Sequence, residues 1–261
     1  EVDAQIIEAS VPFIKNLTKC VMQAGIDIDD LVLAPLASAQ SVLTKRQKEL
    51  GVVLIELGGG TTGFVAFEES EMLHTNILPV GSDHITNDIA IGLRTSVDLA
   101  NTVKLAYGRA GNGIVKKDEV INLAKLDKNE EGQISRSHLT NIIQARLEEI
   151  FSMVNKELKK LNRDGQLPAG AVLTGGGAKI PGLVELAKKE LRLPVQIGYP
   201  LNISTIIDRV DDPAYATAVG LVLWADEYLA SSGVGMGRFA SKILKNASMD
   251  KIRKFFKQFR L

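Results

Sequence analysis

Two glycine triplets are the part of this sequence best suited to binding a ligand through the backbone. Residues 58–60 follow an apolar run and precede Thr61 and Thr62, and residues 175–177 follow a second apolar run. Glycines at the end of a strand let the backbone approach a ligand and direct N–H groups at it, and threonine hydroxyls suit phosphate oxygens. A tight turn would explain either triplet alone. The presence of two triplets favours a nucleotide held in a cleft. The sequence contains no GxxxxGK[ST] loop, which argues against a P-loop enzyme.

Other residue types that carry chemistry are sparse. Cys20 is the one cysteine, so no internal disulfide can form, and His74, His84 and His138 lack metal-ligand spacing. Lys plus Arg and Asp plus Glu number 31 each, which argues against a general nucleic-acid binder. With 45% hydrophobic and 24% charged residues, the composition is typical of an ordinary globular chain.

Positive charge is concentrated in residues 238–261, which hold eight Lys or Arg and one acid. Within them, residues 249–261 have apolar side chains at helical spacing and basic residues elsewhere, a pattern typical of helices that lie in a membrane interface. The alternative is a helix docked on the protein's own core. The glycine-rich stretch 230–237 before it favours a flexible linker and an anionic lipid surface as partner. The predicted membrane-binding residues are Lys251, Ile252, Arg253, Lys254, Phe255, Phe256, Lys257 and Phe259.

Hydrophobic periodicity predicts strands and helices that alternate around these motifs. The run at residues 52–55 is apolar, β-branched and bounded by glycine, which is typical of a strand buried on both faces. This alternation predicts an α/β fold with a mixed or parallel sheet. We expect strands at 1–10 (the end of a strand), 31–33, 52–55, 63–68, 72–79, 171–173 and 195–197. We expect helices at 11–24, 35–50, 84–93, 96–107, 137–161, 181–191 and 213–229.

The two triplets lie in motifs that resemble known families. Residues 57–63 (LGGGTTG) resemble the second phosphate loop of the actin and heat-shock-chaperone ATPase superfamily, and residues 173–178 (LTGGGA) resemble its adenosine motif. More specific motifs resemble the FtsA family of bacterial actin homologues. They are LPVG at 78–81, HITNDIA at 84–90, GLRT at 92–95, PAGAVL at 168–173, GYP at 198–200 and PAYATAVGL at 213–221.

This resemblance implies an actin-like, ribonuclease-H-like ATPase fold with an incomplete first half, an α+β inserted subdomain and a C-terminal amphipathic helix. It also implies that the first phosphate loop, and with it half of the nucleotide cleft, is absent from this chain. The implied domains are the end of inserted domain 1C (1–10), the C-terminal part of domain 1A (11–48), domain 2A (49–83 and 166–226), domain 2B (84–165), a linker (227–248) and the membrane-targeting helix (249–261).

The resemblance further implies site residues. Lys104 matches a family position near the ribose, whereas Asn101 stands where relatives often have Glu. Arg146 and Glu149 would by themselves indicate a solvated i,i+3 pair, but they match family contacts to the C-terminal peptide of FtsZ. A guanidinium fork suits a peptide carboxylate. The nucleotide-binding residues so expected are Gly58, Gly59, Gly60, Thr61, Thr62, Lys104, Gly175, Gly176 and Gly177.

Two departures from the superfamily concern hydrolysis. Many relatives carry Asp where this chain has Glu56 and Gly63, and those acids help to place Mg²⁺ and the attacking water. Glu56 is therefore a weak catalytic candidate, and it could equally be a strand-end acid without a ligand. We expect the full-length protein to bind ATP with Mg²⁺ as a switch and to have at most weak ATPase activity.

Together these features predict a protein that polymerises with bound ATP and anchors the FtsZ ring to the cytoplasmic face of the bacterial cell membrane at the division septum. The expected partners are FtsZ, further copies of the protein, anionic lipid and other division proteins, but no nucleic acid. Two alternatives stay open: an ATP-hydrolysing relative of chaperones or sugar kinases, and a pilus-assembly scaffold on the same fold. The substitutions at Gly63 and Asn101 argue against the first, and the amphipathic tail argues against both.

Overall fold

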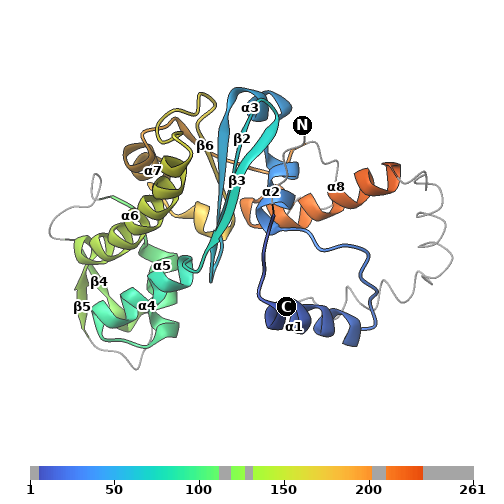
Figure 1. The fold of residues 1–261 in the computed structure, drawn as a ribbon. Coiled ribbons are helices and arrows are strands. Elements are labelled where there is room, and N and C mark those ends of the chain that lie inside the picture. Colours follow the sequence, from blue (N-terminus) through green and yellow to red (C-terminus); the bar gives the residue numbers. More distant parts are fainter. Residues whose placement is uncertain (1–5, 112–118, 127–131, 202–209, 232–261) are drawn as a thin grey trace.

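The computed structural model describes residues 6–111, 119–126, 132–201 and 210–231. A five-stranded sheet forms its centre, with strand order β3-β2-β1-β6-β7 (Figure 1). β1 pairs antiparallel with β2 and parallel with β6, so the sheet is mixed, as the sequence predicts. The strands are β1 (Val52–Leu57), β2 (Thr62–Glu68), β3 (Glu71–Leu78), β6 (Ala171–Thr174) and β7 (Val195–Ile197).

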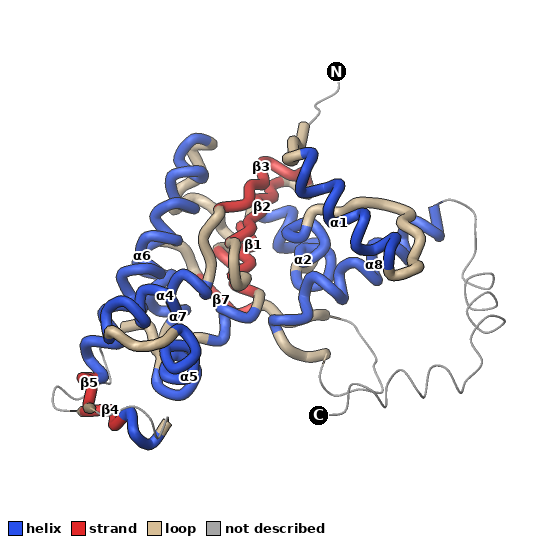
Figure 2. The backbone as a smooth tube through the Cα atoms, turned by 90° about the horizontal axis from the view of Figure 1, so that it is seen from below, coloured by secondary structure: helices blue, strands red, loops and turns tan. Residues whose placement is uncertain are grey.

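β1 is buried on both faces because helices cover the sheet on both sides. Successive strand residues point to opposite faces, so Leu54 and Ile55 belong to different hydrophobic layers. Figure 2 shows the strands between two groups of helices. The continuous apolar run of β1 follows from this two-sided burial.

The helices α2 (Ala34–Val42) and α8 (Ala216–Ser231) cover one face of the sheet. Small residues bring them into close contact: a Cβ atom on Gly220 would lie 1.7 Å from the Ala37 carbonyl oxygen. The buried Ser41 hydroxyl donates to the Ala216 carbonyl at 2.7 Å. The two helices therefore form one tightly joined layer.

The other face carries the larger core. Its helices are α4 (Ser82–Leu93), α5 (Val97–Tyr107), α6 (Arg136–Lys160) and α7 (Leu183–Leu191). Ser96 and Ser135 cap α5 and α6, since their hydroxyls accept from Leu99 N and His138 N. A two-stranded sheet of β4 (Val120–Asn122) and β5 (Gln133–Ser135) leads into α6.

Two predicted strands are wrong. Residues 6–10 form no strand, and residues 1–5 lie outside the described residues. Residues 31–33 were expected as a buried strand, but they form none and Leu31 is 54% exposed. Neither segment pairs with a strand of the described sheet, and without pairing an extended segment gains no ladder hydrogen bonds. Between them lies the predicted helix α1 (Val11–Gln23), none of whose residues is buried.

The helix predicted at 35–50 is also wrong as one element, because it is divided into α2 and α3 (Lys45–Leu50). α2 ends where Leu43 is extended, and Thr44 caps α3. Its hydroxyl accepts from Gln47 N at 3.2 Å, and its own N–H donates to Gln47 Oε1 at 2.9 Å. This reciprocal capping box starts α3 where the charged residues begin.

Short 3-10 turns adjust other helix boundaries. The predicted helix 181–191 begins only at Leu183, and the predicted helix 213–229 opens with a 3-10 turn before α8. α8 continues to Ser231, into the stretch predicted as linker, because its glycines begin only at residue 233. The turns are η1 (Leu123–Lys125), η2 (Gly176–Lys179) and η3 (Pro213–Tyr215).

Candidate functional site

The two glycine loops lie side by side, at the carboxyl ends of the neighbouring parallel strands β1 and β6. Gly175 has φ +84°, and a Cβ atom there would lie 2.5 Å from the Leu57 carbonyl oxygen. A Cβ atom on Gly177 would lie 2.9 Å from Leu57 Cβ. Glycine is therefore required at both positions for the loops to touch.

The first loop is fastened to the N-terminus of α4. Gly58 N donates to Thr61 O at 2.9 Å and closes the turn, while Ser82 N and Asp83 N donate to the carbonyls of Gly58 and Gly59, both at 2.9 Å. Loop carbonyls thus satisfy N–H groups of the helix end. A Cβ atom on Gly60 would meet nothing within 4 Å, so this side of the loop is open.

The two threonines of the loop differ in their surroundings. Thr61 is exposed beside the glycines. Thr62 is fully buried, and its hydroxyl donates to the Val80 carbonyl at 2.7 Å. The expectation that both hydroxyls face a phosphate is corrected for Thr62, because β2 begins there and its side chain points into the protein.

Lys104 of α5 reaches the same helix end. Its ammonium group donates to Thr86 Oγ1 at 2.6 Å and to the Ser82 carbonyl at 3.2 Å. Burial lowers the pKa of Lys104, and the nearby carboxylate of Asp83 opposes this shift. The loops, the first turn of α4 and Lys104 thus form one polar cluster that contains a cation, Lys104, and a carboxylate, Asp83.

The second loop is fastened to the segment before α8. Gly175 N donates to the Pro213 carbonyl at 3.0 Å, and Thr174 Oγ1 donates to the same oxygen at 3.1 Å. Lys179 pairs with Asp212 at 2.7 Å, and this hydrogen bond lowers the pKa of the Asp212 carboxyl. Gly176 itself is exposed, and a Cβ atom there would meet nothing within 4 Å.

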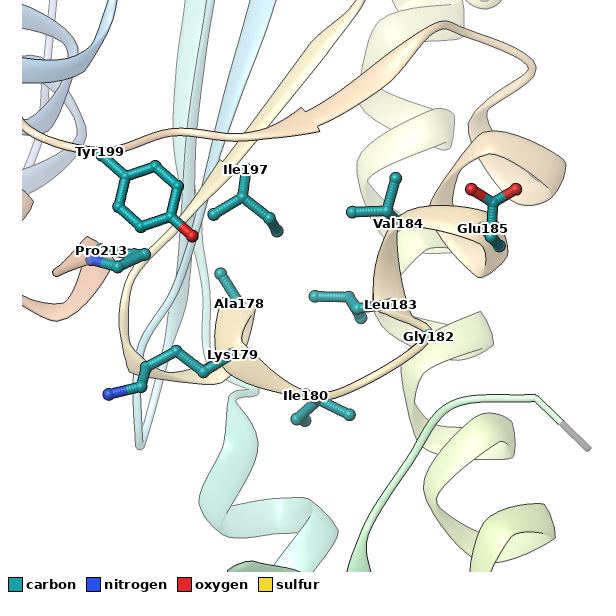
Figure 3. Close-up of a pocket in the computed structure, with 10 residues that line it drawn as sticks. All are labelled: Ala178, Lys179, Ile180, Gly182, Leu183, Val184, Glu185, Ile197, Tyr199 and Pro213. Atoms are coloured by element: carbon teal, nitrogen blue, oxygen red, sulfur yellow. The ribbon is translucent and has the colours of Figure 1, made fainter. Parts of the chain in front are cut away.

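A pocket of about 360 Å³ adjoins η2 (Figure 3). Its walls are mostly apolar, with the ring of Tyr199 on one side, and such walls suit a flat, weakly polar group such as a nucleotide base. The sequence analysis did not predict this pocket, although the motifs at 173–178, 198–200 and 213–221 contain Ala178, Tyr199 and Pro213. The lining residues are Ala178, Lys179, Ile180, Gly182, Leu183, Val184, Glu185, Ile197, Tyr199 and Pro213.

Glu56 already has a partner within the protein. Its carboxylate accepts a hydrogen bond from the Thr217 hydroxyl of α8. Thr217 Oγ1 also lies 2.9 Å from Ser38 Oγ of α2. Gly63 pairs with Glu56 across β1 and β2, and a Cβ atom there would lie 2.5 Å from Pro35 Cγ. No group of three or more potential metal ligands occurs among the described residues. Glu56 and Asp83 are the carboxylates beside the first loop, and with no third ligand among the described residues they do not form a Mg²⁺ site by themselves.

A second candidate surface lies between α4 and α6. Asp88 binds the guanidinium of Arg146 with both oxygens, at 2.6 Å from Nε and 2.8 Å from Nη2, and the pKa of Arg146 is raised mainly by this hydrogen bonding. Glu149 lies 2.5 Å from Arg146 Nη1. The predicted pair is thus a three-residue cluster, and the sequence analysis missed Asp88 because it lies on a different helix.

This surface also has apolar parts. A Cβ atom on Gly92 would lie 2.6 Å from Ile142 Cδ1, so glycine lets α4 and α6 approach one turn away from the charged cluster. Ile91 is 77% exposed on α4, and Ala145 is exposed on α6. Fixed charges beside accessible apolar side chains suit an amphipathic peptide.

The third candidate site, the amphipathic tail at 249–261, lies outside the described residues, as do residues 232–248 of the predicted linker. None of the helices in the described part of the chain is long and apolar enough to cross a lipid bilayer.

Comparisons with known proteins agree on one family. A family model described as cell division protein FtsA matches residues 53–220. Cell division protein FtsA of Pseudomonas aeruginosa is 38% identical over 224 residues, which are 86% of this chain and 54% of that protein. The protein of the same name from Bacillus subtilis is 39% identical over 225 residues, 86% of this chain and 50% of that protein. The chain spans about half the length of these relatives.

Solved structures identify the fold. MreB 5 of Spiroplasma citri bound to AMPPNP matches with a TM-score of 0.68 at 17% identity, over 87% of this chain and 68% of that one. At this identity the likeness concerns the fold, which is actin-like.

Proposed function

The chain belongs to the FtsA family of cell division proteins and has an actin-like fold, and we propose that it holds FtsZ polymers at the cytoplasmic face of the bacterial cell membrane, at the division septum. Three sites divide this task. The glycine loops bind ATP, the α4–α6 surface binds the C-terminal peptide of FtsZ, and the tail at 249–261 binds anionic lipid. The whole protein forms actin-like filaments with ATP bound and helps to recruit further division proteins.

The observation that carries the nucleotide part is the meeting of both glycine loops and Lys104 at the first turn of α4. Gly60 and Gly176 present open backbone there, and Lys104 lies within hydrogen-bond distance of Ser82 and Thr86. Backbone N–H groups and a cation are the groups that hold phosphate oxygens. When ATP is bound, its γ-phosphate supplies the charge that distinguishes the two nucleotide states.

We propose a switch with at most weak hydrolysis. Hydrolysis needs groups that position a metal and a water at the γ-phosphate. Gly63 offers no carboxylate, and Glu56 is engaged by Thr217. Glu56 remains the one catalytic candidate at these positions, and Mg²⁺ would be held chiefly by the phosphates and water.

The α4–α6 surface supports a peptide partner. The guanidinium fork of Arg146 holds Asp88 through Nε and Nη2, and a peptide carboxylate would bind through its remaining Nη hydrogens. Asp88 and Glu149 hold the fork in place, which lowers the ordering cost of binding. Ile91 and Ala145 provide apolar contact beside it.

Membrane attachment is tested by recruiting FtsZ to vesicles. The full chain should bring FtsZ polymers down with vesicles that contain anionic lipid. The double variant Phe255→Glu, Phe256→Glu should not, because two charges enter the apolar stripe and two side chains worth roughly 1.5–3 kcal/mol each are lost. Binding of the FtsZ peptide in solution should be unchanged.

Phe13→Glu is the matched control, because Phe13 is 77% exposed on α1 and lies outside the tail. It should leave vesicle binding intact. Co-sedimentation of the tail double variant at the level of the parent would contradict the membrane role.

A further inference from the structure

The start of α8 is joined to both strands that carry the glycine loops. Thr217 donates to Glu56 at the end of β1. The Pro213 carbonyl, one turn earlier, accepts from Gly175 N at 3.0 Å and from Thr174 Oγ1 at 3.1 Å. Both strands that carry the loops are therefore hydrogen-bonded to the same helix end.

The direction of the hydrogen bonds follows from the chemistry of the groups. An ionised carboxylate only accepts, so the one proton of the Thr217 hydroxyl goes to Glu56. Ser38 must then donate to Thr217, at 2.9 Å. The result is a series of hydrogen bonds that all point the same way, from Ser38 of α2 through Thr217 of α8 to Glu56 of β1. The donor-to-acceptor direction depends on the Glu56 carboxylate as the final acceptor.

α2 and α8 respond together because their contact leaves no free space. A Cβ atom on Gly220 would lie 1.7 Å from Ala37 O, and Ser41 also joins the helices through the Ala216 carbonyl. Packed layers of this kind shift as a unit and do not deform gradually.

We propose that Thr217 is a positioning residue that fixes the Glu56 carboxylate and makes α8 the element that responds to nucleotide at the glycine loops. The proposal rests on the nucleotide binding proposed above. With nucleotide bound, a cation or water at the phosphates would compete with Thr217 for the Glu56 carboxylate, and Thr217 would then lose its acceptor. In the sequence, α8 precedes the predicted linker and the amphipathic tail, so the responding helix is the one to which the membrane segment is tethered.

The test compares three variants of the full-length protein. Thr217→Val keeps the shape and removes the hydroxyl, whereas Thr217→Ser keeps the hydroxyl. Thr140→Val is the control, because Thr140 is a helical threonine whose hydroxyl donates to the Arg136 carbonyl of its own helix, at 3.0 Å, and not to another element. Amide hydrogen exchange of residues 213–228 is measured without nucleotide and with AMPPNP and Mg²⁺, and calorimetry measures AMPPNP binding.

Without nucleotide, Thr217→Val should speed exchange at the start of α8 by about fivefold, the equivalent of one lost hydrogen bond. Thr217→Ser and Thr140→Val should match the parent there. AMPPNP should change α8 exchange in the parent and in Thr217→Ser, but not in Thr217→Val, which still binds it.

Three results would overturn the proposal. One is a parent that binds AMPPNP without any change in α8. Another is a Thr217→Val variant that responds as the parent does. The third is failure of the parent and of all variants to bind AMPPNP, which would also contradict the proposed nucleotide function. Calorimetry recognises this outcome, independently of the exchange difference measured without nucleotide.

Discussion

α4 separates two candidate sites that are built from different materials. At its N-terminus the glycine loops form a site from backbone, where Gly58 and Gly59 carbonyls meet the first turn of the helix. One to two turns later, Asp88 on the same helix forms a site from charged side chains with Arg146. A backbone site depends on the absence of side chains, whereas a charged site depends on the presence of particular ones.

This difference decides how each site fails. At the loops, an added side chain either clashes with the protein or fills space meant for a ligand, and the geometry distinguishes the two cases. At the α4–α6 surface, reversing one charge leaves the packing nearly intact but repels the partner. Substitutions at the loops should therefore have the larger effects on stability.

The sharpest test of this contrast is a pair of neighbouring glycines. Gly175→Val should destabilise the protein by about 3 kcal/mol or more, because valine is strained at φ +84° and its Cβ would lie 2.5 Å from Leu57 O. Gly176→Val should change the unfolding free energy by less than about 1 kcal/mol, since its Cβ meets nothing within 4 Å. Urea denaturation measures both.

Nucleotide binding completes the comparison. Gly176→Val should abolish AMPPNP binding in calorimetry while the fold persists, because the new side chain occupies the open side of the loop. A folded Gly176→Val protein that binds like the parent would show that this loop does not approach the ligand. Equal destabilisation by both substitutions would contradict the distinction between clash and open space.

The charged surface is tested by Arg146→Glu. This change places a third carboxylate beside Asp88 and Glu149 and should weaken binding of the FtsZ C-terminal peptide at least about tenfold, or about 1.4 kcal/mol. The cost in stability should be about 1 kcal/mol, because the cluster is partly exposed. Fluorescence anisotropy of a labelled peptide measures the affinity.

Lys160→Glu is the control on the same helix. Lys160 pairs with Glu157 near the end of α6, away from the cluster, so peptide binding should change by less than about twofold. Similar losses from both charge reversals would indicate a diffuse electrostatic effect in place of a site.

The glycine loops were easier to place from sequence than the charged cluster. The glycine triplets and the apolar runs before them are local signals, and the strands at β1, β2, β3, β6 and β7 lie where the runs predict them. The burial of Thr62 could not be foreseen, because it depends on where β2 begins. The wrong strand at residues 31–33 has the same origin, since a short apolar run does not reveal whether a pairing edge exists.

Partners that come from other elements were missed at both sites. Asp88 lies 58 positions from Arg146, and Thr217 lies 161 positions from Glu56. No spacing rule joins residues so far apart, and only the packing of α4 on α6 or of α8 on the sheet brings them together. The division of α2 from α3 was in principle predictable, because Thr44 and Gln47 form the T-x-x-Q pattern of a capping box.

The smallest effect concerns a charge that supports the backbone site. Lys179 holds the pKa of the Asp212 carboxyl below its ordinary value, so the ionised form is favoured in the folded state. A carboxyl whose pKa is lowered in the folded state stabilises the protein at pH values above its ordinary pKa of about 3.9. This stabilisation is lost as the pH falls through the pKa of the folded state. Asp212→Asn should thus cost less than about 1 kcal/mol at pH 7, given the exposure of Lys179, and almost nothing near pH 2. Urea denaturation of parent and variant at both pH values gives the difference; a cost that persists unchanged in acid would show that it does not come from the charge of Asp212, since asparagine keeps an oxygen that accepts from Ala214 N.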